Sequence, residues 1–337
     1  MSPRKPSVTA QDVARLAGVS RAVVSRALSS NGSISPDARA RVLRAAEELG
    51  YQVNFLAQGL NRQRSHLIGV IVSRIRDPFR SALLDALLNE IQRQGFQALV
   101  SEIHSEQDLA HTLRRFTQFR VSGVIVTSGQ PPEALVNECV QQHIPVVGIN
   151  RQPTIPGVDY VCSDNVAGAE LAADQLLRSG CRRFGWLNHS PSTWAGRMRG
   201  EAFSRALQAR GVDVERNLAI LACPEEGYTG GFQAAALADE ALEGIFCANA
   251  QIACGFLDGM RQRGKQAPED YQLIGFDNTP PTAQYSYQLT TLHQDVAAIS
   301  RQALARLQER TVDPLQPSRT TWVEVTLIHR RTSPFII

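Results

Sequence analysis

From about residue 66 onward, short runs of aliphatic and β-branched residues alternate with longer amphipathic stretches. The run LIGVIVS, which starts at residue 67, predicts a strand, and RSALLDALLNEIQRQG predicts a helix that ends at Gly95. The alternation continues through GVIVTS and PVVGIN, and a second series runs from AGAELAADQLLRSG to LIGF. Strand–helix–strand order predicts a parallel sheet with helices on both faces, so the two series predict an α/β body of two similar lobes.

The first fifty residues carry a helical pattern without a strand. TAQDVARLAG predicts one helix that ends at Gly18, and Ser20 caps a second helix that starts at Arg21. A third helix starts after Ser35. A helix, a tight turn, a second helix and a supporting helix form a helix-turn-helix unit, whose second helix enters the major groove of DNA.

Charge sharpens this picture because it is unevenly distributed. Residues 1–65 contain ten Lys and Arg against four Asp and Glu, a net charge of +6, whereas the whole chain carries +3. A basic head on a mildly acidic body favours a polyanionic partner for the head. Arginines on the outer face of the second helix can donate two hydrogen bonds to guanine O6 and N7.

Other classes of protein fit the sequence poorly. The longest apolar run, LIGVIV, is too short to span a bilayer, and the N-terminal residues lack the apolar segment of a signal peptide, so we expect a cytoplasmic, nucleoid-associated protein without membrane contact. The six cysteines have no metal-ligand spacing. Because HExxH, P-loop, GxSxG and GxGxxG motifs are missing, we expect no enzyme activity, cofactor or metal.

Motifs lie along nearly the whole chain, in the head segment from TAQDVARLAGVS to ELGYQVN and in HLIGVIV, IPVVGINR, GRMRGEAF, QLIGFDN and LTTLHQD of the body. In these segments the sequence resembles the LacI/GalR family of bacterial transcription regulators. The resemblance implies an all-α helix-turn-helix headpiece (1–52), a hinge helix or linker (53–65), and a two-lobed, periplasmic-binding-protein-like body (66–337) with parallel sheets. The N-lobe would contain about 66–163 and 294–322, and the C-lobe about 164–293 and 323–337, with chain crossings near 163, 293 and 323.

The same resemblance implies specific DNA contacts. Arg21 and Ala22 match the base-reading pair, and Leu60 matches the hinge leucine that wedges into the minor groove. Val53 stands where the family usually has proline. The expected DNA contacts are Thr9, Ser20, Arg21, Ala22, Ser25, Arg26, Ser29, Tyr51, Asn54, Ala57 and Leu60.

Ligands of open parallel sheets bind beyond the carboxyl ends of the strands, and in a two-lobed body these ends face each other. The resemblance implies that an effector binds there, with Arg197 and Asp277 as its strongest contacts. Phe79, Asn150 and Asn249 would come next.

Three features of this region depart from the family pattern or bear on the ligand. Ala250 stands where the family commonly has aspartate, and Glu226 stands where the lactose and purine repressors have an aromatic side chain, with Tyr228 nearby. Several arginines crowd the expected cleft, which is compatible with an acidic or phosphorylated sugar.

These observations together predict a homodimeric, sequence-specific DNA-binding regulator. We expect a repressor of a carbohydrate (sugar or sugar-acid) utilisation operon, released from a pseudo-palindromic operator by a sugar, sugar acid or sugar phosphate. Two alternatives keep DNA binding and change the switch to a phosphocarrier protein or a corepressor. A solute-binding protein would explain the body but not the basic head.

Overall fold

The structure is a computed structural model of the whole chain and describes residues 8–28, 33–51, 65–127, 133–190 and 192–333. The chain divides into two compact units, Met1–Ser65 and His66–Ile337.

The first unit contains three helices among its described residues: α1 (Ala10–Ala17), α2 (Arg21–Ala27) and α3 (Pro36–Glu48). Gly18 ends α1 in the left-handed conformation, with φ of 63°, and makes the tight turn before α2. Ser20 caps α2 by accepting a hydrogen bond from the backbone of Val23 at 3.4 Å. The helices pack around a small core of Val and Ala side chains, and these are Val13, Ala14, Ala17, Val24, Ala27, Val42, Ala45 and Ala46.

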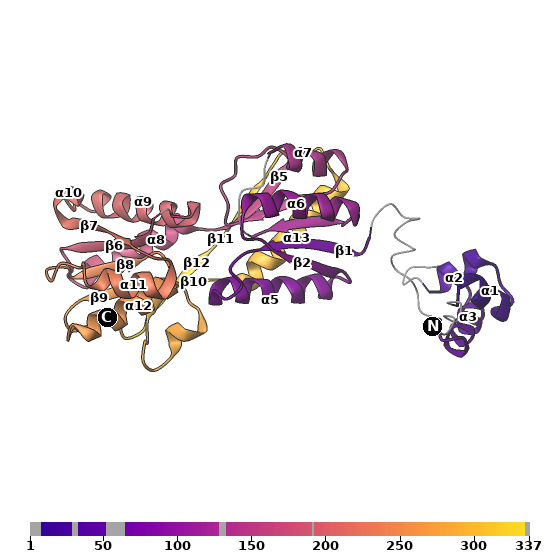
Figure 1. Cartoon of the computed structure of the whole chain (residues 1–337), viewed down its shortest axis with the longest axis horizontal. Helices are drawn as coiled ribbons and strands as arrows, with labels where there is room; N and C mark the ends of the chain where they lie inside the picture. Colours follow the sequence, from indigo (N-terminus) through magenta and orange to yellow (C-terminus); the bar gives the residue numbers. More distant parts are fainter. Residues whose placement is uncertain (1–7, 29–32, 52–64, 128–132, 191, 334–337) are drawn as a thin grey trace. The chain divides into compact units, whose positions relative to one another are not determined.

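The N-lobe of the second unit is a parallel sheet in the order β11-β5-β4-β3-β1-β2. Helices α6 and α7 cover one face of this sheet, and α5 and α13 cover the other (Figure 1). The strands are β1 (Leu67–Val72), β2 (Gln97–Glu102), β3 (Gly123–Val126), β4 (Val146–Ile149), β5 (Val158–Ser163) and β11 (Thr320–Val323). The helices are α5 (Pro78–Arg93), α6 (Glu106–Gln118), α7 (Glu133–Gln141) and α13 (Val296–Val312).

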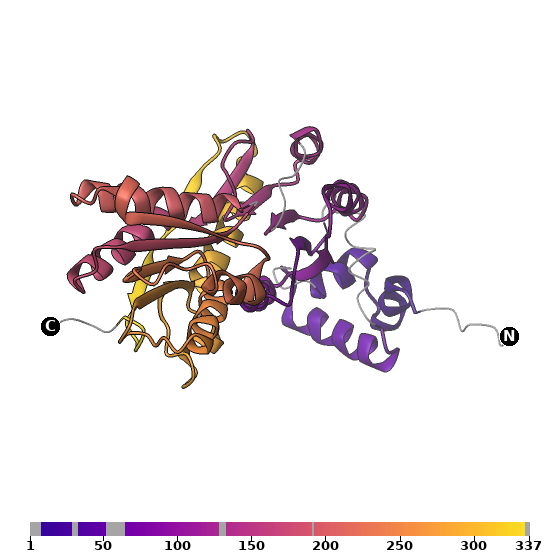
Figure 2. The same cartoon turned by 60° about the vertical axis from the view of Figure 1, so that its left-hand side comes forward.

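The C-lobe repeats this arrangement with a sheet in the order β12-β10-β9-β8-β6-β7 (Figure 2). Its edge strand β12 runs antiparallel to β10. The expectation of a purely parallel sheet is therefore wrong for this lobe. The strands are β6 (Phe184–His189), β7 (Leu218–Cys223), β8 (Gly244–Cys247), β9 (Gln272–Asp277), β10 (Thr290–Gln294) and β12 (Val325–Ile328). The helices are α8 (Asn165–Arg178), α9 (Trp194–Ala209), α10 (Val214–Asn217), α11 (Gly227–Ala235), α12 (Ala250–Gln262) and the 3₁₀ turn η1 (Pro280–Ala283).

The chain passes between the lobes at three places, each with a single residue between two elements. Asp164 lies between β5 and α8, Asp295 between β10 and α13, and Glu324 between β11 and β12. The two aspartates also cap the helices that follow them, because their carboxylates accept hydrogen bonds from backbone amides three residues on, at 2.9 and 2.8 Å. The lobes are therefore joined by short links with little spare length.

Helices α11 and α12 approach each other closely enough to require glycine. A Cβ atom built on Gly231 would lie 2.1 Å from the carbonyl oxygen of Ile252, and one on Gly255 would lie 1.9 Å from that of Tyr228. Backbone therefore contacts backbone at this crossing. The start of α11, which reaches the gap between the lobes, is positioned by this contact.

The six cysteines are free and buried, and burial raises the pKa of each thiol. Within the described part of the chain, no helix has both the length and the apolar character needed to cross a membrane.

Candidate functional site

Helix α2 presents a polar face away from the core of the head. Arg21, Ala22, Ser25 and Arg26 are exposed, whereas Val24 and Ala27 on the opposite side are buried. The Arg39 guanidinium on α3 donates to the carbonyl oxygen of Ala27 at 2.9 Å and fastens the end of α2. This arrangement offers two arginines and two small side chains to a partner.

The other expected DNA contacts fall into two groups. Thr9 is exposed at the start of α1, where its backbone amide donates to Asp12 at 3.0 Å, and Tyr51 packs half-buried against the core of the head. Ser29, Asn54, Ala57 and Leu60 lie outside the described residues.

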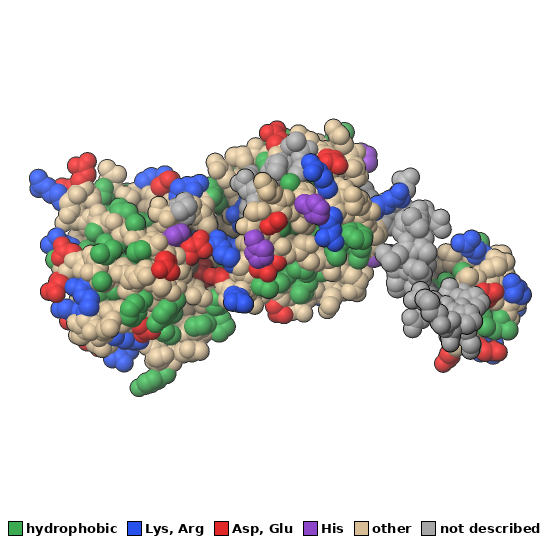
Figure 3. Space-filling model, viewed as in Figure 1, with side chains coloured by type: hydrophobic (Ala, Val, Ile, Leu, Met, Phe, Trp, Pro, Cys, Tyr) green, Lys and Arg blue, Asp and Glu red, His purple; other side chains and the backbone are tan. Residues whose placement is uncertain are grey.

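A cavity of about 860 Å³ lies between the two lobes of the body. Its walls are formed by the residues that follow the carboxyl ends of strands in both sheets, as the parallel topology requires. Charged and histidine side chains gather on the face where the lobes meet (Figure 3). The volume is within the range of small-molecule sites, about 300–1,000 Å³.

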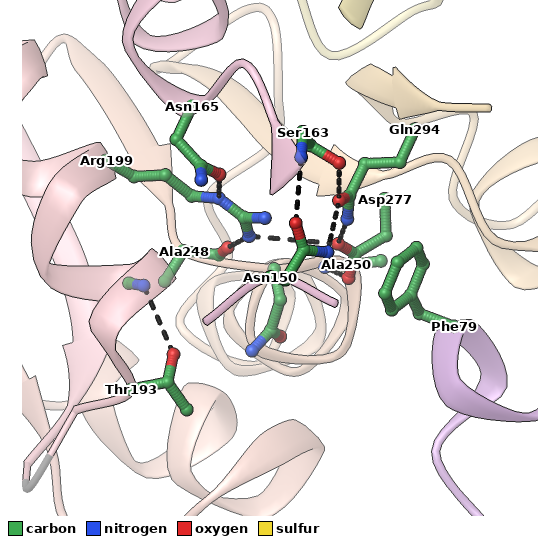
Figure 4. A network of polar contacts seen from close by, with 12 residues as sticks. Phe79, Asn150, Ser163, Asn165, Thr193, Arg199, Ala248, Ala250, Asp277 and Gln294 are labelled. Atoms are coloured by element: carbon green, nitrogen blue, oxygen red, sulfur yellow. Dashed lines mark hydrogen bonds and ion pairs between the residues drawn. The ribbon is translucent and has the colours of Figure 1, made fainter. Parts of the chain in front are cut away.

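Asp277 lies at the centre of the polar wall, at the end of β9 (Figure 4). One carboxylate oxygen accepts a hydrogen bond from Gln294 Nε2 at 2.6 Å, and the other accepts from the backbone of Ala250 at 3.3 Å. Arg199 Nη1 lies 3.8 Å from the first oxygen. Burial raises the pKa of Asp277 to about 6, although the Arg199 charge opposes this increase.

Arg199 is buried on α9 and is held on three sides. Its Nε donates to Asn165 Oδ1 at 2.7 Å, and its Nη1 donates to the carbonyl oxygen of Ala248 at 2.6 Å. Its guanidinium carbon lies 3.5 Å from the ring centroid of Phe276. Desolvation lowers the pKa of Arg199 to about 10. The guanidinium is thus a rigid, charged group in the cavity wall.

Gln294 joins this C-lobe cluster to the N-lobe (Figure 4). Its Nε2 donates to Asp277, while its Oε1 accepts from Ser163 Oγ at 2.5 Å and from Asn150 Nδ2 at 3.3 Å. Asn150 Oδ1 in turn accepts from the backbone of Ser163 at 2.8 Å. One amide side chain therefore connects the ends of strands from both sheets.

The structure brings four of the five expected effector contacts to the cavity: Phe79, Asn150, Asn249 and Asp277. The side chain of Asn249 also caps α12, because its Oδ1 accepts a hydrogen bond from the backbone of Ile252 at 2.9 Å.

Arg197 does not line the cavity, and the place expected of it is taken by Arg199. Arg197 is exposed and donates from Nη1 to the carbonyl oxygen of Ser192 at 2.9 Å. The two arginines are two residues apart, so they point in directions about 200° apart around the helix. Gly196, Arg199 and Phe203 lie on the buried stripe of α9, and this helical spacing is the signal that could have identified Arg199.

Two charged side chains connect the lobes at the edge of the cavity. Arg74, after β1, forms an ion pair with Glu226, which precedes α11. His189 Nε2 lies 3.9 Å from the other oxygen of Glu226. Tyr228 also lines the cavity, and its hydroxyl donates to Asp258 at 2.8 Å. Among the described residues, no group of three His, Cys, Asp or Glu side chains could hold a metal ion.

We expect the stability of the Asp277→Asn variant to differ from that of the wild type in a pH-dependent way. The pKa of Asp277 is about 6 in the folded state against an ordinary value of 3.8, so the carboxyl is protonated in both states only below about pH 3. As the pH rises from 4 to 6, only the unfolded state ionises, and the wild type loses roughly 2–3 kcal/mol of stability through this group. Asparagine cannot ionise, so the free energy of unfolding of the variant, measured in urea, should rise relative to that of the wild type by this amount over the same pH range. A difference independent of pH would mean that Asp277 titrates as it does in water.

Comparison with known proteins agrees with this architecture. Residues 9–54 match the family described as bacterial regulatory proteins, lacI family, and residues 173–333 match the periplasmic binding protein-like domain. The transcriptional regulator GalS of Salmonella typhimurium is 31% identical over 329 residues, which cover 96% of each chain. A crystal structure of the lac repressor dimer bound to operator and the anti-inducer ONPF has a TM-score of 0.84 at 23% identity, covering 98% of this chain and 100% of that one.

A second solved structure matches most of the chain. A LacI family transcriptional regulator from Enterococcus faecium with bound ribose has a TM-score of 0.72 at 26% identity, covering 80% of this chain and 100% of that chain. The GalS match extends over the head and the body together. The chain therefore belongs to the lacI family of bacterial regulatory proteins and is a DNA-binding transcriptional regulator.

Proposed function

We propose that this regulator is a homodimeric repressor that leaves a pseudo-palindromic operator when a small polar effector binds between its lobes. The observation that carries the proposal is the buried chain of polar contacts from Arg199 through Asp277 and Gln294 to Asn150, which lies in the cavity wall and joins both lobes. The regulated genes would serve the use of a sugar or sugar acid.

The DNA-binding half of the proposal is supported by the face of α2. Arg21 and Arg26 are exposed there beside Ala22 and Ser25, so two donors stand among side chains small enough to let the helix lie deep in the groove. A single short helix reads few base pairs, and two heads related by a twofold axis would read a symmetric site. Ser20, Ser25, Ser29 and Tyr51 are proposed to touch or approach the phosphate backbone, and Thr9, Asn54, Ala57 and Leu60 complete the proposed interface.

The ligand-binding half is supported by fixed donors and acceptors. Polyhydroxy ligands need several polar groups in set positions, and the side chains of Arg199, Asp277 and Asn150 are each held by hydrogen bonds. The related Enterococcus faecium regulator was solved with ribose. A sugar-like effector in this cavity is therefore proposed for this chain as well.

The proposed switch would act on contacts that join the two lobes. The Arg74–Glu226 ion pair and the Gln294–Asn150 hydrogen bond both join the lobes, so a ligand inserted among them favours a different spacing. Such a ligand shifts the equilibrium only by its differential affinity for the two states, typically about 1–3 kcal/mol of coupling.

The proposal is tested with the full-length protein in two steps. Selection from a random duplex library, followed by footprinting, should yield a symmetric pair of half-sites. Sugars, sugar acids and sugar phosphates are then screened for release of that operator and for a rise in the melting temperature of the protein. A selected DNA sequence without symmetry would contradict the homodimer. A ligand that tightens operator binding would be a corepressor instead of an inducer. Release only by a phosphocarrier protein would replace the small-molecule switch.

Arg21→Ala is expected to relax the base preference at one position of each half-site. The lost bidentate contact to guanine should weaken binding of the preferred operator by about 1–3 kcal/mol per half-site and leave other sequences nearly unaffected. Competition binding with operator variants measures this effect. Arg41→Ala, which removes an exposed charge from α3, is the control and should leave the order of preferred sequences unchanged. An unchanged base preference in Arg21→Ala would show that this side chain does not read bases in the groove.

A further inference from the structure

Two arginines form the floor of the cavity on the N-lobe side. Arg80 lies in the first turn of α5, after β1, and its Nη1 donates to the hydroxyl of Ser73 at 2.6 Å. Arg151 follows β4, and its Nη2 donates to the carbonyl oxygen of Thr127, after β3. Because β1, β3 and β4 are consecutive in the sheet, the two guanidinium groups flank the end of the middle strand. Both side chains line the cavity.

Arg151 is unusual because its side chain is half-buried and its guanidinium is only partly hydrogen-bonded. Its Nε is buried without a hydrogen-bond partner, and no acidic side chain of the described residues lies within ion-pair distance of it. Desolvation lowers the pKa of Arg151 to about 10, and repulsion from Arg80 and Arg74 lowers it further in the same direction. Desolvation and repulsion from Arg74 also lower the pKa of Arg80, whereas the carboxylates of Asp77 and Asp277 oppose this decrease. A buried cation next to other cations is unfavourable unless an anion compensates it.

The acids near the floor are already engaged. Asp77 Oδ1 accepts hydrogen bonds from the backbone of Phe79 and Arg80 at 3.0 Å each, so this carboxylate serves as the cap of α5. Glu226 pairs with Arg74, and Asp277 is held by Gln294 and the backbone of Ala250. An additional anion would therefore balance the positive charge of the two floor arginines.

The N-termini of four helices around the cavity also favour an anionic ligand. The residues that precede α5, α9, α11 and α12 all line it, and these are Asp77, Thr193, Glu226 and Asn249. The positive ends of four helix dipoles thus face the cavity and add to the potential of the arginines.

We propose that the effector carries an anionic group, a carboxylate or a phosphate on a polyhydroxy skeleton, and that this group binds between Arg80 and Arg151. Guanidinium groups at the cavity surface offer charged N–H donors that match two oxygens of such a group, and both Arg80 and Arg151 line the cavity. The hydroxyl groups of the ligand would face Asp277 and Arg199 on the C-lobe side of the cavity and Asn150 next to Arg151. This inference rests on the proposed function, because it names the class of ligand that the same cavity takes.

The alternative role for Arg151 is that of a strut that only holds Thr127 and β3 in place. The two roles make different predictions for neutral ligands. A strut supports every ligand of the cavity equally, whereas an anion contact affects only the charged one.

The test measures binding to the full-length protein by calorimetry. The probes are glucose and galactose, each compared with its uronate, its aldonate and its 6-phosphate. We expect at least one anionic compound to bind about 30–100 times more tightly than its neutral parent, as a charged hydrogen-bonded pair contributes. Preference for the uronate or aldonate would identify a carboxylate, and preference for the 6-phosphate would identify a phosphate.

Arg151→Met should remove most of this preference while changing the affinity for the neutral parent about threefold or less. Arg151→Lys, which keeps the charge, should restore part of it. Arg114→Met is the matched control, since Arg114 is exposed on α6 in the same lobe and its loss lowers the net charge equally. The variants' melting temperatures report whether each is folded.

Three results would overturn the inference. If the neutral parents bind as tightly as the anions, the effector needs no anionic group and the inference is wrong. Release of the operator by a neutral sugar would in that case still support the proposed function. Equal weakening of neutral and anionic probes by Arg151→Met would make this residue a strut. If no probe binds and none releases the operator, both the inference and the small-molecule switch fail.

Discussion

Replacing Arg199 by methionine is expected to lower the free energy of unfolding of the body by about 3–5 kcal/mol, as breaking a buried ion pair does, and to abolish the effector response. The substitution leaves Asp277 buried without its cation and takes the donors away from Asn165 Oδ1 and the Ala248 carbonyl. Urea unfolding gives the first quantity, and the ligand-induced rise in melting temperature gives the second.

Arg197→Met is the matched control for this experiment. Arg197 lies on the same helix and carries the same charge, but its side chain is exposed and donates a hydrogen bond to the carbonyl oxygen of Ser192. Its stability should stay within about 0.5 kcal/mol of the wild type. If Arg197→Met lost the effector response and Arg199→Met kept it, Arg197 and not Arg199 would be the residue that contacts the effector.

Gly231→Ala is expected to destabilise the protein by about 3 kcal/mol or more, at the upper end of overpacking effects. The new methyl group would lie 2.1 Å from the carbonyl oxygen of Ile252, and a backbone atom cannot turn aside as a side chain can. Helix α11 must move as a unit, and it carries Tyr228 at the cavity wall. The variant should therefore also bind the effector more weakly.

Gly185→Ala provides the comparison for Gly231→Ala. It adds the same methyl group to β6, where the nearest atoms, in the side chains of Ile245 and Leu242, lie 3.4 Å away. This is an ordinary contact distance, so we expect little change in the urea midpoint. Similar losses of stability in both variants would show that the loss comes from replacing glycine itself and not from the helix crossing.

The sequence was most informative where local patterns decide the structure. The exposed face of α2 follows from the helical period of its valines and alanines and from the Ser20 cap, so the sequence alone places Arg21 and Arg26 on that face. The two lobes and their largely parallel sheets follow from the alternation of apolar runs and amphipathic stretches. These features depend on residues close together in the chain.

The cavity wall was harder to predict because its parts are distant in sequence. Gln294 is 131 residues from Ser163 and 144 residues from Asn150, and no local pattern marks it as the link between the lobes. Arg197 and Arg199 differ only in the phase of one helix, which short motifs do not fix. The antiparallel edge strand β12 depends on how the chain returns after its last crossing, and that is a property of the whole fold.

The buried cysteines give this protein a built-in set of chemical reporters. Cys139 and Cys162 lie in the N-lobe, and the C-lobe contains Cys181, Cys223, Cys247 and Cys254. Thiol reagents attack the thiolate, and the raised pKa values together with burial leave little of it accessible in the folded protein. Labelling therefore proceeds through opened molecules, and mass spectrometry of each labelled peptide gives the opening rate of each lobe separately. A ligand that bridges the lobes would slow labelling in both, and the ratio of the two rates would tell how evenly its binding energy is shared.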